Sequence, residues 1–196
     1  GQNEEIKTTA TYKNNEKIDE TTISLKDKKP FIGTYSENFE NGNINQVVKF
    51  KEGKRDGETI FYYDNGKIRE RIPYVNGNKE GEYFYYNKVG EVVGKGLFVN
   101  DRKEGQWLVY DESDKTLIDK IYVNGLEEGA YKVYYQDGKV RAEGMYKAGK
   151  MEGDYKAYYP NGSLETEVKY VNGKREGAYK VQYETGKLKE SGNYKD

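Results

Sequence analysis

Residues 153–176, with the sequence GDYKAYYPNGSLETEVKYVNGKRE, contain two short strand-like segments separated by turn signals. The first segment is rich in Tyr, and the second runs from Leu164 to Val171. Asn161-Gly162 lies between them and favours a two-residue type I′ turn, because both central residues of that turn need positive φ. A longer loop, residues 172–176, leads into the next Gly-x-Tyr. The stretch therefore predicts an antiparallel β-hairpin.

The same pattern recurs every 24 residues without an insertion, at Gly33, Gly57, Gly81, Gly105, Gly129, Gly153 and Gly177. It divides the chain into seven units, 33–56, 57–80, 81–104, 105–128, 129–152, 153–176 and 177–196. Residues 1–32 keep the strand chemistry but lose the glycines, so we expect a degenerate N-terminal capping repeat. The predicted fold is all-β: an elongated, twisted single antiparallel sheet of tandem 24-residue hairpins.

The pairing register follows from the turn. With Asn65-Gly66 as the turn, Thr59 faces Ile72. The same arithmetic places Tyr131 opposite Gly144. If the loop at 148–151 has four residues, Gly144 also faces Tyr155. Large rings are thus expected to lie against glycines, which gives each ring a slot.

Alternation along the strands predicts an aromatic inner face and a charged outer face. The inner face carries a structural aromatic ladder: Tyr35, Tyr83, Trp107, Tyr131, Tyr155 and Tyr179 on the first strands, and Tyr74, Tyr122, Tyr146 and Tyr170 on the second strands. A ligand groove is the alternative interpretation of this ladder.

A second column of tyrosines lies on the predicted outer face, at Tyr62, Tyr86, Tyr110, Tyr134 and Tyr158. We call it the outer tyrosine column. Arg69 and Arg141 are its expected cross-strand partners, placed for cation–π contact. Exposed Tyr and Arg are enriched in binding hot spots, so these residues are candidates for binding. The alternative is a surface ladder that only stabilises the sheet.

Two further features have a functional and a structural interpretation. Each unit ends in an acid, at Asp56, Glu80, Glu104, Glu128, Glu152 and Glu176. Clustered carboxylates attract calcium, but Lys or Arg precedes most of them, so we expect a solvated loop with local ion pairs and no metal site. The third and fourth units break the pattern: the turn at Asn87 is shifted, Asp101 replaces a glycine, and residues 111–114 contain none. A hinge or docking point near Trp107 is one interpretation, and a different turn type is the other.

Composition argues against several classes of function. Net charge is −1, from 33 basic and 34 acidic residues of mixed order, so no basic stripe indicates nucleic-acid binding. The chain has no His and no Cys, which excludes Ser-His-Asp and Cys-His catalysis and the common zinc sites. The sequence contains no run of about 20 apolar residues, so we expect no transmembrane segment. No carboxylate pair stands out as a hydrolase site, so we expect no enzyme activity and no cofactor.

The units Tyr-Val-Asn-Gly-x-x-Glu-Gly-x-Tyr-x-x-Tyr-Tyr-x-Asn-Gly-Lys resemble the MORN repeat variant found in many bacterial proteins. The resemblance covers about 33–196, and Tyr122 to Gly138 and Tyr170 to Gly186 are the best copies. The chain lacks the His and the close Gly-x-Gly pairs of the better-known MORN form, so that form's lipid-binding role does not carry over. The resemblance implies a hairpin array used for interaction. Some bacterial relatives are labelled antitoxins and others are exported.

We therefore predict a non-enzymatic scaffold that binds another protein through an extended Tyr-rich face, using several weak contacts in parallel. A glycan- or choline-binding module is the first alternative, since aromatic hairpins build cages for such ligands. An antitoxin-like protein and a structural spacer are others, and balanced charge argues against membrane-surface adhesion. We expect an exported protein, periplasmic or at the cell surface, with a cytoplasmic one as the alternative. The partner's identity and the oligomeric state stay open.

Overall fold

The computed structural model describes residues 5–13, 16–111 and 113–195, and of residues 16–19 only the backbone. The described residues contain no helix, and strands β3 to β19 belong to a large antiparallel sheet of tandem hairpins that is not closed. The predicted all-β class of tandem hairpins is therefore confirmed. The chain divides into two compact units, residues 1–92 with 97–102, and residues 93–96 with 103–196. Each unit is described below by itself.

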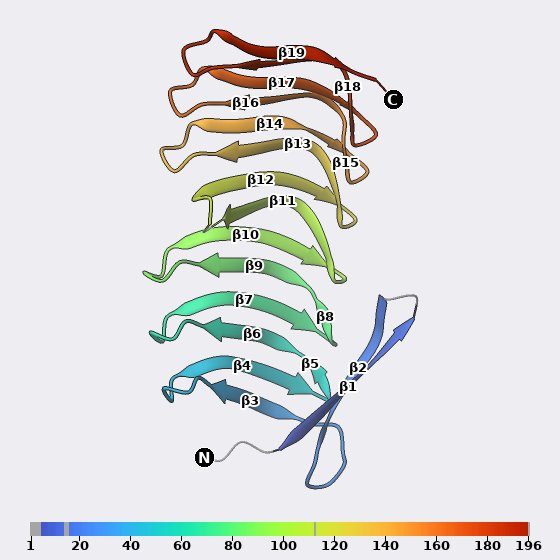
Figure 1. The fold of residues 1–196 in the computed structure, drawn as a ribbon. Helices are drawn as coiled ribbons and strands as arrows, with labels where there is room; N and C mark the ends of the chain where they lie inside the picture. Colours follow the sequence, from blue (N-terminus) through green and yellow to red (C-terminus); the bar gives the residue numbers. More distant parts are fainter. Residues whose placement is uncertain (1–4, 14–15, 112, 196) are drawn as a thin grey trace. The chain divides into compact units, whose positions relative to one another are not determined.

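The first unit begins with a hairpin that forms a two-stranded sheet of its own and continues into the hairpin array (Figure 1). Its strands are β1 (Ile6–Lys13), β2 (Glu16–Ser24), β3 (Gly33–Asn38), β4 (Ile44–Lys51), β5 (Lys54–Arg55), β6 (Gly57–Tyr62), β7 (Ile68–Val75), β8 (Asn78–Lys79) and β9 (Gly81–Tyr86). Strand β10 (Val92–Val99) has residues in both units. The core of this unit is built on Phe31, Val48 and Phe50, with Ile6 and Tyr35 packed against it.

The second unit contains the later hairpins in chain order. Its strands are β11 (Arg102–Asp111), β12 (Thr116–Val123), β13 (Leu126–Tyr134), β14 (Val140–Lys147), β15 (Lys150–Met151), β16 (Gly153–Tyr158), β17 (Leu164–Val171), β18 (Lys174–Gln182) and β19 (Leu188–Tyr194). Trp107, Val133, Ala142 and Val168 are its buried apolar side chains among those described. They all come from one face of the strands, which is the predicted inner face.

The turn predicted at Asn161-Gly162 has a different type. Only Gly162 has positive φ, at 87°, and its N–H bonds to the carbonyl of Tyr159 at 2.8 Å. The turn is therefore type I with Pro160 as its second residue, followed by a glycine in the left-handed region. Proline fixes φ near −65°, which suits this position of a type I turn. The type I′ prediction was wrong in the same way at Gly66 and Gly138, where Asp64 and Gln136 stand in place of Pro160, so this turn does not depend on proline.

The type I′ turns lie at the opposite ends of the strands. Ala148 and Gly149 have φ of 49° and 78°, and Lys147 pairs with Lys150 around them. The predicted four-residue loop at 148–151 is therefore a two-residue turn. A bulge after Met151 then restores the predicted register, since Glu143 pairs with Lys156. Pairing away from the turns agrees with the sequence arithmetic, including Thr59 with Ile72 and Tyr131 with Gly144.

The hairpin β1–β2 contacts the first type I′ turn of the array. The N–H of Thr22 bonds to the carbonyl of Gly53 at 2.7 Å, and the N–H of Gly53 bonds to Phe31 at 2.8 Å. Thr22 is fully buried in this contact. The hairpin thus covers a turn and adds no strand to the array. That residues 1–32 are a capping repeat stays a prediction, and residues 1–4 and 14–15 lie outside the described residues.

Successive repeats are joined by the acids that end each unit. The carboxylate of Glu128 accepts the main-chain N–H of Ala148 at 2.8 Å, and that of Glu152 accepts the N–H of Asn172 at 2.8 Å. Asp56, Glu80 and Glu104 accept the same bond from the main-chain N–H 20 residues later in the chain. Each of these five acids therefore binds the next type I′ turn. This bond is a structural role for these acids that the sequence analysis did not predict.

Candidate functional site

The inner aromatic ladder is held by glycine slots. Trp107 is only 2% exposed, and a Cβ on Gly96 would lie 2.1 Å from its Cδ2 atom. A Cβ on Gly192 would likewise lie 2.6 Å from Tyr179 Cε1. Other rings of the ladder contact a second-strand ring edge-on, in the pairs Tyr83–Phe98, Trp107–Tyr122, Tyr131–Tyr146 and Tyr155–Tyr170. Tyr35 packs against the Phe31 core, and Tyr74 is buried.

Burial changes the acidity of these phenols. It raises the pKa of Tyr131 to about 12, with smaller contributions from the neighbouring phenols of Tyr155 and Tyr146. The pKa of Tyr83 is raised further, first by burial and then by the nearby carboxylate of Glu70. These hydroxyls are therefore neutral at physiological pH.

A further set of tyrosines, adjacent in sequence to the outer column, links one repeat to the next. The hydroxyl of Tyr63 donates to the carbonyl of Tyr86 at 2.7 Å, and that of Tyr135 donates to the carbonyl of Tyr158 at 2.7 Å. Tyr159 makes the same bond 23 residues ahead, to Gln182. In the pairs Tyr62-Tyr63, Tyr134-Tyr135 and Tyr158-Tyr159, the second Tyr thus ties the repeats together and the first belongs to the outer column.

The outer tyrosine column is half-buried on the face opposite the core. The hydroxyl of Tyr158 donates to Glu143 at 2.8 Å, and burial together with this bond raises its pKa to about 12. Tyr86 is hydrogen-bonded to Arg71, which also binds Glu58 at 2.6 Å. Two members of the column are therefore tied to charged side chains of the same face.

The two arginines expected beside this column lie elsewhere. Tyr134 pairs with Val140, and the register shift next to this pair leaves Arg141 without a partner on the opposite strand. The guanidinium of Arg141 lies over the ring of Tyr135, and that of Arg69 lies 5.4 Å from the ring of Phe61. Both rings alternate with the outer column along their strands and so lie on the inner face. The predicted cross-strand contacts of Arg69 and Arg141 with the outer tyrosines were therefore wrong, because a bulge inserts one residue.

The outer face of the second unit carries a line of alternating charge that crosses six strands. Direct cross-strand pairs connect its members in the order Asp119, Lys132, Glu143, Lys156, Glu167 and Lys180. Lys156 Nζ lies 3.3 Å from Glu167 Oε1 within this line. We call it the charge row. The sequence signal for it is a spacing of alternately 13 and 11 residues between opposite charges, which single-strand reasoning did not detect.

An apolar group lies beside the charge row, close to the type I′ turns. It consists of four outer-face side chains that are 38–54% exposed, Ile121, Val123, Leu126 and Met145. We call them the outer apolar patch. Val123 pairs with Leu126, and a Cβ on Gly129 would lie 3.7 Å from Ile121 Cδ1. The sequence predicted a charged outer face and missed this patch. Its signal is the Val of Tyr-Val-Asn-Gly, which alternates with an inner Tyr.

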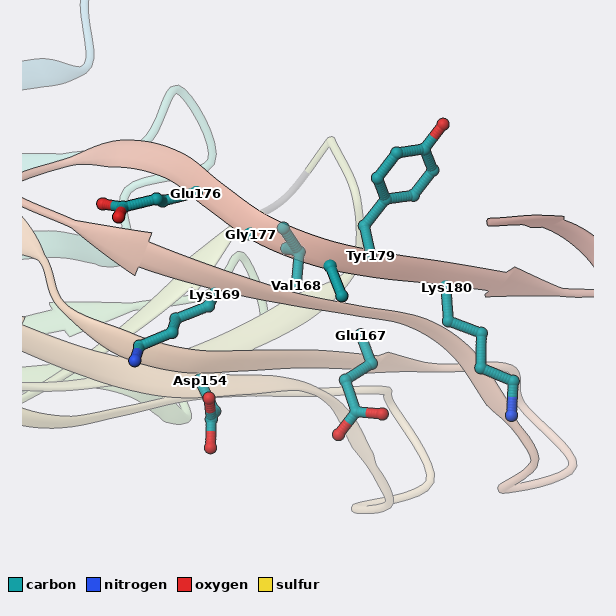
Figure 2. A pocket seen from close by; sticks show the side chains of 9 residues that line it. Asp154, Glu167, Val168, Lys169, Glu176, Gly177, Tyr179 and Lys180 are labelled. Carbon is teal, nitrogen blue, oxygen red and sulfur yellow. The ribbon is translucent and has the colours of Figure 1, made fainter. Parts of the chain in front are cut away.

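A hollow of about 330 Å³ opens between β16, β17 and β18 (Figure 2). It forms where the register shifts next to Val168, so that Gly177 and Ala178 have no direct partner on β17, although both pair with β19. Lys169 and Lys180 line it together with the carboxylates of Asp154, Glu167 and Glu176. In Figure 2 the side chains of Asp154, Glu167, Lys169 and Lys180 extend to one side of the strands and Tyr179 to the other. The hollow therefore belongs to the outer face.

The irregular turn of the fourth unit keeps its fold by side-chain bonds. The carboxylate of Asp111 accepts bonds from the N–H and hydroxyl of Ser113, which lower its pKa. Lys115, with φ of 53°, takes the left-handed position that glycine takes elsewhere. Asp114 binds Arg141 at 3.0 Å. The turn at Asn87 has the regular bonds with Gly90 at φ of 94°, so the shift predicted there was wrong.

Within the described parts of the chain, no group of three His, Cys, Asp or Glu residues could hold a metal ion. None of the elements described in residues 5–13, 16–111 and 113–195 is a helix that could cross a membrane.

The sequence matches the family model described as MORN repeat variant over residues 55–76, 127–148, 151–172 and 175–196. These matches begin in phase with the 24-residue spacing. A comparison with curated proteins finds no match. Among solved structures, the chain is similar to a chain of the Photorhabdus luminescens Tc holotoxin pore, at 10% identity and a TM-score of 0.19. The similarity covers 96% of this chain and 15% of that chain, and at this TM-score it carries no argument.

Proposed function

We propose, from the premise that the chain belongs to the MORN repeat variant family, whose model matches four stretches between residues 55 and 196, that it is a non-enzymatic scaffold that binds another protein. The binding surface is the outer face of its sheet. One observation carries the proposal: the outer apolar patch exposes four large apolar side chains beside a charge row and the outer tyrosine column.

The composition of this face supports protein binding. Protein interfaces have an apolar centre and a polar rim, with Tyr and Met enriched. Met145 is 54% exposed, and Tyr134 lies half-buried on the same strand pair. Exposing an apolar cluster to water is unfavourable unless a partner covers it. The inner face offers no such cluster, since its rings are packed against glycines and one another.

The repeats present this surface in a rigid form. Each turn is bonded to the next by a carboxylate, and Tyr135 and Tyr159 bond each hairpin to the one after it. A partner therefore meets side chains that are already ordered, which lowers the entropy cost of binding. The same observations favour a scaffold over an enzyme, because the carboxylates have structural partners. A location in the periplasm or at the cell surface remains part of this proposal.

The test is capture of a partner from fractionated cells of the source organism, with the whole chain as bait. Leu126→Ser with Met145→Ser removes the centre of the patch, and Leu188→Ser is the matched control, because Leu188 is equally exposed (56%) but lies on β19. We expect the control to capture the same protein as the native chain and the double variant to lose it. Capture that survives the double variant would contradict the outer face as the binding surface.

A further inference from the structure

The charge row has opposite signs at positions equally distant from its centre. From β12 to β18 its signs run minus, plus, minus, plus, minus, plus. The row has an even number of members, so the reversed row has the opposite sign at each position. A face with this property is complementary to a second copy of itself that is turned end for end.

We propose that a second copy of this chain docks face to face on the outer face of the second unit, about a two-fold axis that runs parallel to the strands between β14 and β16. The proposal rests on the outer face being an interaction surface. The axis places β12 against β18 of the second copy, β13 against β17, and β14 against β16. Asp119 then meets Lys180, Lys132 meets Glu167, and Glu143 meets Lys156, each pair occurring twice.

The alternative two-fold axis is excluded by the same row. An axis along the row would place each strand on its own copy, so that Glu143 would meet Glu143 and Lys156 would meet Lys156. Like charges in direct opposition are unfavourable, and there would be six such contacts. Charge therefore selects one orientation of the second copy.

The surroundings of the row agree with this orientation. Ile121 lies on β12 and is 38% exposed. The axis brings it opposite Ala178 on β18, which lines the hollow. The hollow is about 330 Å³, enough to take an isoleucine side chain, and Val168 and Gly177 are among the residues that line it. One exposed apolar side chain per copy thus fits one hollow per copy.

The contact is expected to be weak and salt-sensitive. Six strands at about 4.8 Å spacing give a row roughly 25 Å long. A strip of that length buries on the order of 1,000 Å² in total, near the lower limit of specific interfaces. Most of its contacts are ion pairs, which salt screens. We therefore expect a dimer with a dissociation constant in the micromolar range. In roughly 0.5 M salt, the affinity should fall at least about tenfold.

The decisive variant inverts the whole row, with Asp119→Lys, Lys132→Glu, Glu143→Lys, Lys156→Glu, Glu167→Lys and Lys180→Glu. It keeps the net charge and an opposite-charge pair at each of these cross-strand positions, and it removes the Glu143 acceptor of the Tyr158 hydroxyl. It is also complementary to itself when reversed. In the proposed orientation, however, every contact between a native and an inverted chain joins like charges; the axis along the row would bring opposite charges together, but it takes Ile121 away from the hollow. We expect each chain to form a dimer in sedimentation equilibrium, and labelled native and inverted chains not to mix.

A second measurement uses only the native chain. Carbodiimide joins a carboxylate and an amine that are in contact. Asp119 and Lys180 lie on strands five spacings apart within one chain, roughly 24 Å. A crosslink between them can therefore form only between two copies, and we expect it in the dimer fraction at low salt.

Three results would overturn the proposal: a chain that stays monomeric at all concentrations in low salt, free mixing of native and inverted chains, or a dimer without the Asp119–Lys180 crosslink. If the chain is monomeric but still captures another protein through the outer apolar patch, the proposed function stands and only the second copy as partner is wrong. If that capture also fails, the interaction surface itself is wrong.

Discussion

Gly96→Ala tests whether glycine slots hold the inner aromatic ladder. A Cβ on Gly96 would lie 2.1 Å from Trp107 Cδ2 and 2.2 Å from Cε2, where real Cβ contacts stay above 3.0 Å. These atoms belong to a rigid ring that is only 2% exposed, so the ring has no free space to enter. The φ angle of Gly96 lies outside the left-handed region, so alanine adds no backbone strain. The whole effect is steric, and overpacking of this kind costs about 1–3 kcal/mol.

The assay follows from the composition. Trp107 is the only tryptophan, so its fluorescence reports on this position alone. We expect the native-state emission of Gly96→Ala to shift to longer wavelength as the ring is displaced into solvent. Urea unfolding followed at the same ring should give a free energy of unfolding lower by about 3 kcal/mol, the upper end of the range, because the ring is fully enclosed.

Gly144→Ala is the matched control, since Gly144 occupies the same position two repeats later. Its Cβ would meet Met151 Cε at 3.3 Å, and Tyr155 Cδ2 and the Asp154 carbonyl oxygen at the ordinary contact distances of 3.5 and 3.6 Å. The methionine end is flexible, so we expect a loss below about 1 kcal/mol. If Gly96→Ala keeps the native emission and has the same free energy of unfolding as Gly144→Ala, steric slots do not hold the ladder.

Three further predictions concern the bonds between repeats and the buried phenols. Tyr135→Phe leaves a carbonyl of the next repeat without its bond and should lower the free energy of unfolding by about 1 kcal/mol; Tyr183→Phe, at an exposed ring, should change it by less than about 0.5 kcal/mol. Glu128→Ala removes the acceptor of the Ala148 N–H, so hydrogen exchange of that amide should accelerate while amides of the first unit keep their rates. The pKa of Tyr131 is raised from 10.0 to about 12, so its neutral form is favoured by folding; the resulting stability is present below pH 10 and is lost as pH rises to about 12. Alkaline unfolding of Tyr131→Phe should therefore depend less on pH in that window, and an unchanged pH dependence would show that this phenol is not the cause.

The repeat and its faces could be predicted because they depend only on spacing and alternation. A step of 24 residues fixes the hairpins, and a period of two assigns Tyr131 and Val133 to one face. The pairing of Tyr131 with Gly144 follows from the same arithmetic. These inferences needed no knowledge of turn geometry, provided that the total length of each turn was right.

Turn types could not be read from Asn-Gly alone, because both ends of the hairpin contain this pair. Asn161-Gly162 and Asn172-Gly173 have the same side chains, yet only Asn172 has positive φ. The difference lies in the surroundings: the residue before Asn161 belongs to the turn, as Asp64 and Gln136 do in other repeats, whereas Val171 before Asn172 continues a strand. A turn therefore has to be assigned from its flanking residues as well as from its central pair.

The bulges decide which binding hypothesis the chain supports. A single inserted residue removes Arg141 from the strand pairing beside Tyr134, and its guanidinium lies over Tyr135 on the inner face. The outer tyrosine column thus loses the cation–π partners that made it resemble a hot spot. What remains on that face comes from pairing between repeats: a charge row assembled from six strands and an apolar patch beside it. Neither exists within one 24-residue unit, so a reading of the repeat as an isolated hairpin cannot find them, and a binding surface on such an array has to be sought across its strands.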